Sequence, residues 1–255
     1  MARQPEGPPP PPTVQKLRIR YAKRGRLRFA SHRDLARALE RALRRAAVPM
    51  AFSAGFTPHP KVSYLGAAPT GAASEAEYLE IGLAQRRDPE EVRAALDAAL
   101  PADIAVLQCV EAGEGTGSLA DRIDAAAWRI ELPGVDPAML AAALEAFLAR
   151  DEVLVARRTK NGLRDVDARA AVAAATTSSD EGCAILQVVV RQVTPAVRPD
   201  DVLAALDAVA DLRPPSPTRA VREAQGRLDD DGTVADPLGP DRAARARCQG
   251  EHAAV

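Results

Sequence analysis

Six patterned segments between residues 16 and 110 follow one another in the order strand, helix, strand, strand, helix, strand. Apolar and polar residues alternate in Leu17–Tyr21 and in Glu77–Leu83, with the period of a half-buried strand. Further strands are expected at Val62–Leu65 and Ile104–Val110, and helices near His32–Ala47 and after Asp88. This order is that of the ferredoxin-like split βαβ motif. The sequence therefore predicts an α+β fold.

Both helices of this unit have recognisable start signals. Ser31 and Asp34 form an S-x-x-D pattern that resembles a capping box, and Asp88 precedes a proline at the first helical position. The segment Leu27–Phe29, which comes before the first helix, is expected to continue or re-enter the first strand. These signals place the helix boundaries within the predicted unit.

A second set of patterned segments begins near residue 125. Strands are expected at Trp128–Leu132, from Val153, and at Ile185–Val190, and helices are expected to begin at Asp136-Pro137 and Pro199. An Asn-Gly pair at 161–162 predicts a turn. Because helices in both halves begin with an Asp-Pro pair, the sequence predicts a duplicated, tandem ferredoxin-like architecture.

Composition sets the limits of the two units. The PEGPPPPP segment near the N-terminus is typical of an extended polyproline II tail, with a proline-recognition ligand as the alternative. Pro, Asp, Gly and Arg predominate from Arg213 onward and predict a second disordered tail. The predicted boundaries are a tail at 1–15, a basic ferredoxin-like domain at 16–112, a linker at 113–124, a second ferredoxin-like domain at 125–212 and a tail at 213–255.

The cysteine and histidine content argues against a metal or cofactor site. Three cysteines and three histidines are scattered without a CxxC or other ligand spacing, so we expect no metal and no cofactor. Sparse cysteines are typical of a reducing compartment. No apolar run reaches the roughly 18 residues of a membrane helix, and no apolar leader is apparent. We expect a soluble cytoplasmic protein with no membrane partner.

Positive charge is concentrated in residues 16–64. This stretch carries thirteen Lys and Arg against two acids, a net charge of +11, whereas the whole chain carries −1. In its helix Arg33, Arg37, Arg41 and Arg44 recur on the side opposite the leucines. A face that serves only solubility usually mixes charge signs, so the pattern favours a polyanionic partner such as nucleic acid. An ordinary solvated helix face is the alternative.

The segment Phe52–Lys61 is the most unusual in the chain. Prolines on both sides of His59 restrict its backbone, and Gly55 permits a tight turn. One interpretation is a rigid loop that presents His59 and Lys61, with Ser53 nearby, to a ligand. The other is a structural loop whose histidine contacts a neighbouring carbonyl group.

Several of these segments resemble a known family. LRFASHRDLARALERALRR, PMAFSAGFTPHPKVSY, SEAEYLEIGL and RRTKNGLRDVDAR together resemble the radical-SAM-associated proteins, over about residues 16–212. The resemblance implies association with a radical SAM protein and no defined reaction; the CxxxCxxC cluster motif of radical SAM enzymes is absent from this chain. If positions shared with the family mark a site, they are Ser31, His32, Asp34, Arg41, Gly55, Phe56, His59, Pro60, Lys61, Arg158, Lys160, Asp167 and Arg169.

Three functions are consistent with the sequence. The first is binding of structured RNA or tRNA by an accessory protein of a radical SAM enzyme. The second is a protein-interaction module that docks an acidic surface, such as that of a radical SAM or ribonuclease partner. The third is metal-independent RNA processing or modification with His59, His32 and Lys61 as catalytic candidates. The RNA-binding candidates are Arg18, Arg20, Arg28, Arg33, Arg37, Arg41, Arg44, Lys61, Arg157, Arg158 and Lys160.

Overall fold

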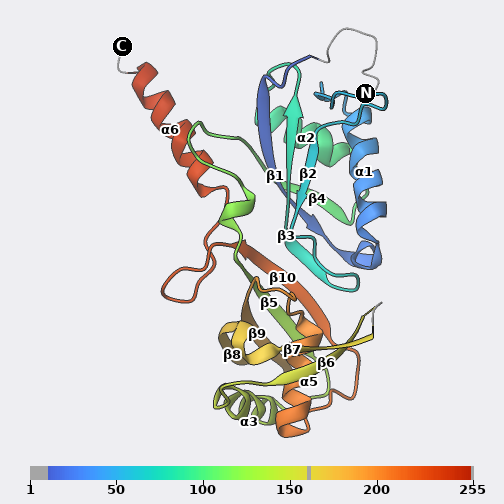
Figure 1. The fold of residues 1–255 in the computed structure, drawn as a ribbon, viewed down its shortest axis with the longest axis vertical. Coiled ribbons are helices and arrows are strands. Elements are labelled where there is room, and N and C mark those ends of the chain that lie inside the picture. The colour runs from blue at the N-terminus through green and yellow to red at the C-terminus, as the bar shows by residue number, and fades with distance from the viewer. Residues whose placement is uncertain (1–10, 160–161, 254–255) are drawn as a thin grey trace, which may run out of the picture. The chain divides into compact units, whose positions relative to one another are not determined.

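A computed structural model describes residues 11–159 and 162–253 (Figure 1). The fold is α+β and divides into two compact units. Unit 1 comprises Met1–Thr70, Ser74–Asp121 and Leu238–Val255, and unit 2 comprises Gly71–Ala73 and Arg122–Pro237. In the described part of the chain, no helix combines the length and apolar character needed to cross a membrane.

The sheet of unit 1 has the strand order β4-β1-β3, with β2 paired to β3 at the side away from β1. Its pairings β1–β3, β1–β4 and β2–β3 are antiparallel. Helix α1 lies between β1 and β2 in the chain, and α2 lies between β3 and β4. The elements are β1 (Gln15–Lys23), the short 3-10 helix η1 (Gly25–Phe29), α1 (His32–Arg45), β2 (Val62–Leu65), β3 (Ala73–Leu83), α2 (Pro89–Ala99), β4 (Ile104–Glu111) and α6 (Gly239–Ala253).

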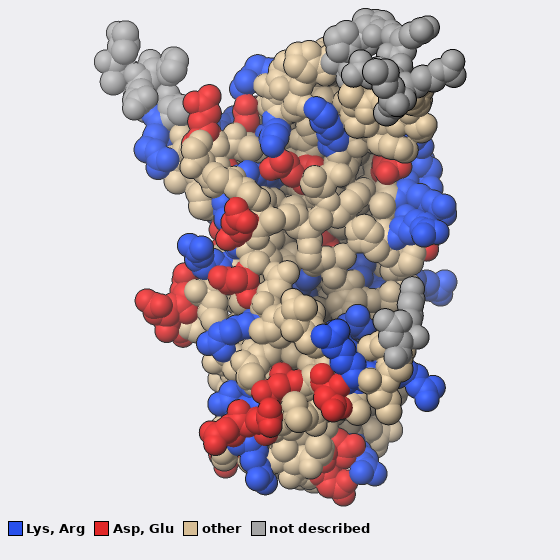
Figure 2. Space-filling model, viewed as in Figure 1, with Lys and Arg blue, Asp and Glu red and all other residues tan. Residues whose placement is uncertain are grey.

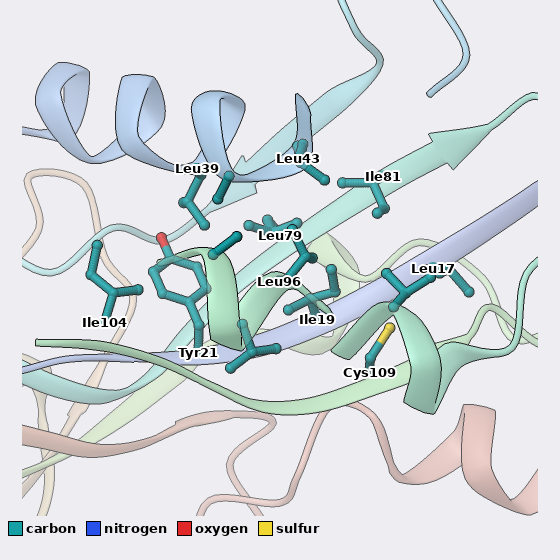
Figure 3. Close-up of a cluster of buried hydrophobic side chains, with 14 of the residues drawn as sticks. Leu17, Ile19, Tyr21, Leu39, Leu43, Leu79, Ile81, Leu96, Ile104 and Cys109 are labelled. Carbon is teal, nitrogen blue, oxygen red and sulfur yellow. The ribbon is translucent and has the colours of Figure 1, made fainter. Parts of the chain in front are cut away.

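Helices α1 and α2 pack on one face of this sheet and form its core (Figure 3). Alternate residues of β1 face them, because successive side chains of a strand point to opposite sides. The cluster is built from Leu17, Ile19 and Tyr21 of β1, Leu79, Ile81 and Leu83 of β3, Leu35, Leu39 and Leu43 of α1, Val92 and Leu96 of α2, and Ile104, Val106 and Cys109 of β4. The other face of the sheet carries the charged residues of β1 and β3, including Lys16, Arg18 and Glu80.

The helix start signals are confirmed. Ser31 is the N-cap of α1: its side chain accepts a hydrogen bond from the Asp34 amide at 3.2 Å, and its hydroxyl lies 2.7 Å from the Asp34 carboxylate. Asp88 caps α2 by accepting from the amides of Glu90 and Glu91. Both caps satisfy amides that the first turn of a helix leaves without a backbone partner.

The sheet of unit 2 has the order β10-β5-β9-β8, and β6 and β7 form a separate two-stranded hairpin. The pairings β10–β5, β5–β9 and β8–β9 are antiparallel. Helices α3 and α5 pack together, and α3 also contacts β8 and β9. The elements are the short η2 (Ala120–Arg122, at the boundary), β5 (Ala125–Leu132), α3 (Pro137–Leu148), β6 (Leu154–Thr159), β7 (Gly162–Asp167), α4 (Ala168–Ala171), β8 (Val172–Asp180), β9 (Cys183–Arg191), α5 (Pro199–Ala210) and β10 (Arg219–Gly226).

Three expectations from the sequence need correction. Leu27–Phe29 lies in the 3-10 helix η1 and not in a strand. The expected disordered tail at 213–255 contains β10 and α6. These segments lack an apolar period: β10 is held by pairing with β5, and α6 is in contact with β1 through the ion pair between Asp241 and Arg18. The expected N-terminal tail at 1–15 ends earlier than predicted, because Val14 bonds to Leu83 and Gln15 begins β1. Residues 1–10 of that expected tail lie outside the described residues.

Candidate nucleic-acid interface

The arginines of α1 form one exposed face of the helix. Arg33, Arg37, Arg41 and Arg44 are all exposed, whereas Leu35, Leu39 and Leu43 are buried against the sheet. The two sets separate because residues three or four positions apart share a helix face. We call these four residues the α1 arginine face. Figure 2 shows Lys and Arg side chains gathered along α1.

Acidic partners are scarce on the α1 arginine face. Arg37 lies 4.0 Å from Asp34, and both side chains are more than half exposed. Within residues 11–159 and 162–253, no hydrogen bond or ion pair of the Arg33, Arg41 or Arg44 side chain is present. Exposed pairs such as Arg37–Asp34 contribute little to stability. The face therefore presents four cations to solvent, and neighbouring acidic side chains neutralise little of their charge.

Exposed aromatic rings lie at both ends of α1 in the sequence. Phe29, two residues before the N-cap, is 59% exposed, and the Arg28 guanidinium lies 4.5 Å from the centre of its ring. Phe52 and Phe56, in the segment after α1, are 41% and 70% exposed. Arg28 is therefore half-buried, with its guanidinium over the Phe29 ring, and is not fully exposed to solvent.

The Phe52–Lys61 segment is a closed loop fixed to the sheet. The Ser53 amide donates to the His59 carbonyl at 2.9 Å, and the His59 amide donates to the Ser53 hydroxyl at 3.0 Å. Outside these bonds, Ala51 and Lys61 both bond to the backbone of Gly82 in β3. These hydrogen bonds add to the restriction that the prolines place on the loop backbone. Gly55, at φ +136°, occupies a conformation that favours glycine.

A hollow of about 380 Å³ lies beside this loop within unit 1. It brings Ser53, His59 and Lys61 together, as one interpretation of the loop requires. We call it the Lys61 hollow. Its lining residues are Thr13, Lys16, Ser53, His59, Pro60, Lys61, Val62, Ser63, Glu80 and Gly82.

Arg18, an RNA-binding candidate on the polar side of the predicted half-buried strand Leu17–Tyr21, is not exposed to solvent. It is 4% exposed, and its guanidinium contacts Glu80 at 3.0 Å and Asp241 of α6 at 2.7 Å. It also donates to the carbonyl of Gly117 at 2.6 Å. Arg20 is half-buried and donates to the Glu75 carbonyl at 2.8 Å. The alternation of β1 was correct, but α6 and the 113–117 segment cover the face on which Arg18 lies.

The candidates in unit 2 have different environments. Arg157 forms an ion pair with buried Asp201 at 2.8 Å, and Arg158 is exposed on the β6–β7 hairpin. Lys160 lies outside the described residues. Asp167 caps α4 by accepting from the amides of Arg169 and Ala170. Arg157 and Asp167 therefore have evident structural roles.

The two candidate histidines occupy different places. The His32 ring meets the Tyr64 ring edge-on, with centroids 5.2 Å apart, whereas His59 lines the Lys61 hollow, to which His32 does not contribute. Burial, with a smaller contribution from the charge of Glu40, raises the pKa of Tyr64 to about 12. Among the described residues no contact joins the His32 and His59 rings, and the two side chains do not line a common hollow. The described residues contain no cluster of His, Cys, Asp or Glu suited to a metal ion.

Sequence reasoning did not associate Thr13, Ser63 and Glu80 with the loop. Their relation depends on strand register: Lys16 lies opposite Gly82, and Arg18 lies opposite Glu80. Alternation in each strand indicates which residues share a face, but it does not indicate which residues of two distant strands are paired. The one usable signal was Gly82, a glycine within a strand, which often marks a close approach of another segment.

The fold and this surface define an α+β protein with a cationic helix face and a polar hollow beside a hydrogen-bonded loop. Residues 16–199 match the family described as "Uncharacterized protein conserved in bacteria (DUF2344)". The match covers more than half of the chain, and the chain belongs to this family. A search of the curated proteins found no match.

Two solved structures are similar to the chain at low scores. An unknown protein from Galdieria sulphuraria is 12% identical with a TM-score of 0.24, and the alignment covers 84% of this chain and 99% of that one. The encapsulated DyP-type peroxidase from Mycobacterium smegmatis is 9% identical with a TM-score of 0.20, over 88% of this chain and 93% of that one. At these scores neither similarity bears on fold or function.

Proposed function

We propose that this protein binds RNA in the cytoplasm through the α1 arginine face. The observation that carries the proposal is the exposure of four arginines on one helix with a single weak acidic contact among them. Phosphate contacts by Arg and Lys supply most of the affinity of nucleic-acid binding. A helix of fourteen residues is about 21 Å long, so the face can meet several successive phosphates.

The exposed rings support contact with unpaired bases. Three of the four phenylalanines in the chain, Phe29, Phe52 and Phe56, are exposed, and they all lie in unit 1. Proteins that recognise RNA loops and single strands stack bases on aromatic side chains beside cationic groups. Structured RNA with loops, such as tRNA, offers both phosphates and unpaired bases. We propose this class of RNA as the partner.

We further propose that both units are ferredoxin-like and that the protein acts beside a radical SAM enzyme. The orders β4-β1-β3-β2 and β10-β5-β9-β8 support the first statement, since each places the first and third strands of a split βαβ unit at the centre. In unit 2 the β6–β7 hairpin would be an insertion after α3. The resemblance of the α1 and loop motifs to radical-SAM-associated proteins supports the second.

The test is a titration of fluorescently labelled tRNA with the full chain at 50 to 200 mM salt. Four arginine contacts to a single strand predict a slope of log K against log salt of about −2.8, or about a fiftyfold loss over this range. Arg37→Ala, Arg41→Ala and Arg44→Ala together should reduce the slope to about −0.7 and the loss to about threefold. The matched control removes Arg86, Arg213 and Arg219, which are exposed but paired with acids.

Three outcomes are informative. Weak binding by the α1 triple variant together with wild-type binding by the control supports the proposal. An equal loss of RNA affinity in the α1 triple variant and in the control shows a nonspecific effect of net charge and contradicts the proposal. If wild-type protein binds no RNA at 50 mM salt, the proposal fails, and an acidic protein surface becomes the partner to seek.

A further inference from the structure

The Lys61 hollow is assembled from three segments that backbone hydrogen bonds hold together. The Ala51 amide donates to the Gly82 carbonyl at 2.8 Å, and the Gly82 amide donates to the Lys61 carbonyl at 3.0 Å. On the other side of β3, Lys16 of β1 lies opposite Gly82. Lys16 and Glu80 alternate with core residues, so the hollow opens on the sheet face opposite α1.

The hollow has an uncompensated cation. Its one acid, Glu80, is paired with Lys16 at 3.2 Å and with Arg18 at 3.0 Å. The Lys61 ammonium instead donates to the Thr13 hydroxyl at 2.9 Å and has no acidic partner among the residues that the structure describes. A single, doubly paired carboxylate makes a poor cation site, whereas Lys61 favours an anionic ligand.

Hydroxyl and imidazole groups line the same hollow as this cation. Ser53 accepts a hydrogen bond from the His59 amide, which leaves its own hydroxyl proton available for donation. Ser63 is exposed in the lining, and the His59 side chain is exposed beside it. Lysine with several neutral donors is a combination that binds phosphate oxygens.

Gly82 allows Lys61 and Thr13 to approach each other. A Cβ atom at this position would lie 3.0 Å from Thr13 Cγ2 and 3.3 Å from Lys61 Cβ. Both distances are tighter than ordinary van der Waals contact. A larger residue would separate the cation from the hydroxyl that positions it, so the glycine is part of the site.

We propose that the Lys61 hollow binds the phosphate group of a phosphomonoester of nucleotide size. Lys61 supplies the charge, and Thr13, Ser53 and Ser63 supply neutral donors. A volume of about 380 Å³ lies within the range of small-ligand pockets and exceeds what a phosphate alone requires. The ligand is either a free nucleotide or the phosphorylated end of an RNA. This site goes beyond the proposed RNA binding by α1, because the two surfaces share no residue.

The test uses the full chain, two-dimensional amide NMR and three probes: inorganic phosphate, a nucleoside 5′-monophosphate and the corresponding nucleoside. We expect saturable shifts at the amides of Ser53, His59 and Ser63 with both phosphates and none with the nucleoside. Lys61→Gln should weaken phosphate binding at least tenfold. Arg213→Gln, which removes one positive charge outside both the hollow and the α1 arginine face, should change it less than twofold and serves as the control.

Absence of saturable shifts up to about 10 mM phosphate, which fills a millimolar site, would overturn the proposal. Equal weakening by Lys61→Gln and Arg213→Gln would also overturn it, because the net charge of the chain and not the hollow would then attract phosphate. Preference for a 5′-phosphorylated oligonucleotide over both its dephosphorylated form and the free nucleotide identifies an RNA end as the ligand; a tighter free nucleotide identifies the small molecule. If the α1 variants bind RNA as tightly as the wild-type protein does, only the RNA-binding proposal is contradicted, and the phosphate-site proposal is unaffected.

Discussion

The buried contact between Arg18 and Asp241 predicts that unit 1 depends on its C-terminal helix. Asp241 is 1% exposed, and its Oδ1 atom accepts from Arg18 at 2.7 Å and from the Gly113 amide at 3.0 Å. The Thr116 hydroxyl lies 2.8 Å from the same oxygen. Asp241→Ala removes a buried charge and leaves Arg18 with Glu80 alone as an acidic partner.

The expected loss of stability in Asp241→Ala is large because the Arg18 guanidinium stays buried after its partner is removed. Removing one partner of a buried ion pair costs about 3–5 kcal/mol, and the lost Gly113 contact adds to the effect. For a protein of this size, that corresponds to a decrease in Tm of about 6–20 °C. Because Arg18 retains Glu80 and the Gly117 carbonyl, we expect a value near the lower limit.

Urea denaturation and hydrogen exchange measure the effect. The free energy of unfolding should fall for Asp241→Ala, and exchange should accelerate at the Gly113 amide and in β1. Arg86→Met is the control: Arg86 pairs with Glu111 but is 67% exposed, so its loss should cost at most about 1 kcal/mol. Replacing Arg18 by Met and Asp241 by Leu together should recover much of the stability, since an apolar pair leaves no unpaired charge.

Equal stability of Asp241→Ala and Arg86→Met would refute this reasoning. A second refutation would come from RNA binding. If Arg18→Met reduced the salt slope as much as loss of an α1 arginine, Arg18 would contact RNA, and the contact with α6 could not be permanent.

Three further predictions concern single residues. Ser31→Ala should destabilise unit 1 by about 1 kcal/mol in urea, because it removes the N-cap of α1; no change would exclude a role for the cap. Phe56→Ala should leave Tm unchanged, since the ring is 70% exposed, but weaken binding of unpaired RNA by about tenfold if a base stacks there. Burial raises the pKa of Cys109 from 9.0 to about 12. The native thiol therefore stays protonated at pH 9, and mass spectrometry should find alkylation at Cys183 but not at Cys109; the unfolded thiol ionises first, so stability should fall between pH 9 and about 12.

The local features of unit 1 were predictable from sequence. The period of α1, its Ser31 cap and the separation of arginines from leucines all follow from interactions within a few residues. The Asp88 cap and the strand at Val62–Leu65 are similar cases. Each depends on neighbouring residues that remain neighbours whatever the rest of the chain does. The exposure of the α1 arginine face was left open by the sequence, and the structure establishes it.

Contacts between distant segments were decided by tertiary structure alone. Alternation in β1 assigns Arg18 to the face away from the core, but α6, more than two hundred residues later, covers that face and buries the charge. Similarly, β10 has no apolar period of its own and becomes a strand by pairing with β5. The Lys61 hollow depends on the register that sets Lys16 opposite Gly82. Periodicity specifies the face of each element; the partner on that face is determined only when the whole chain packs.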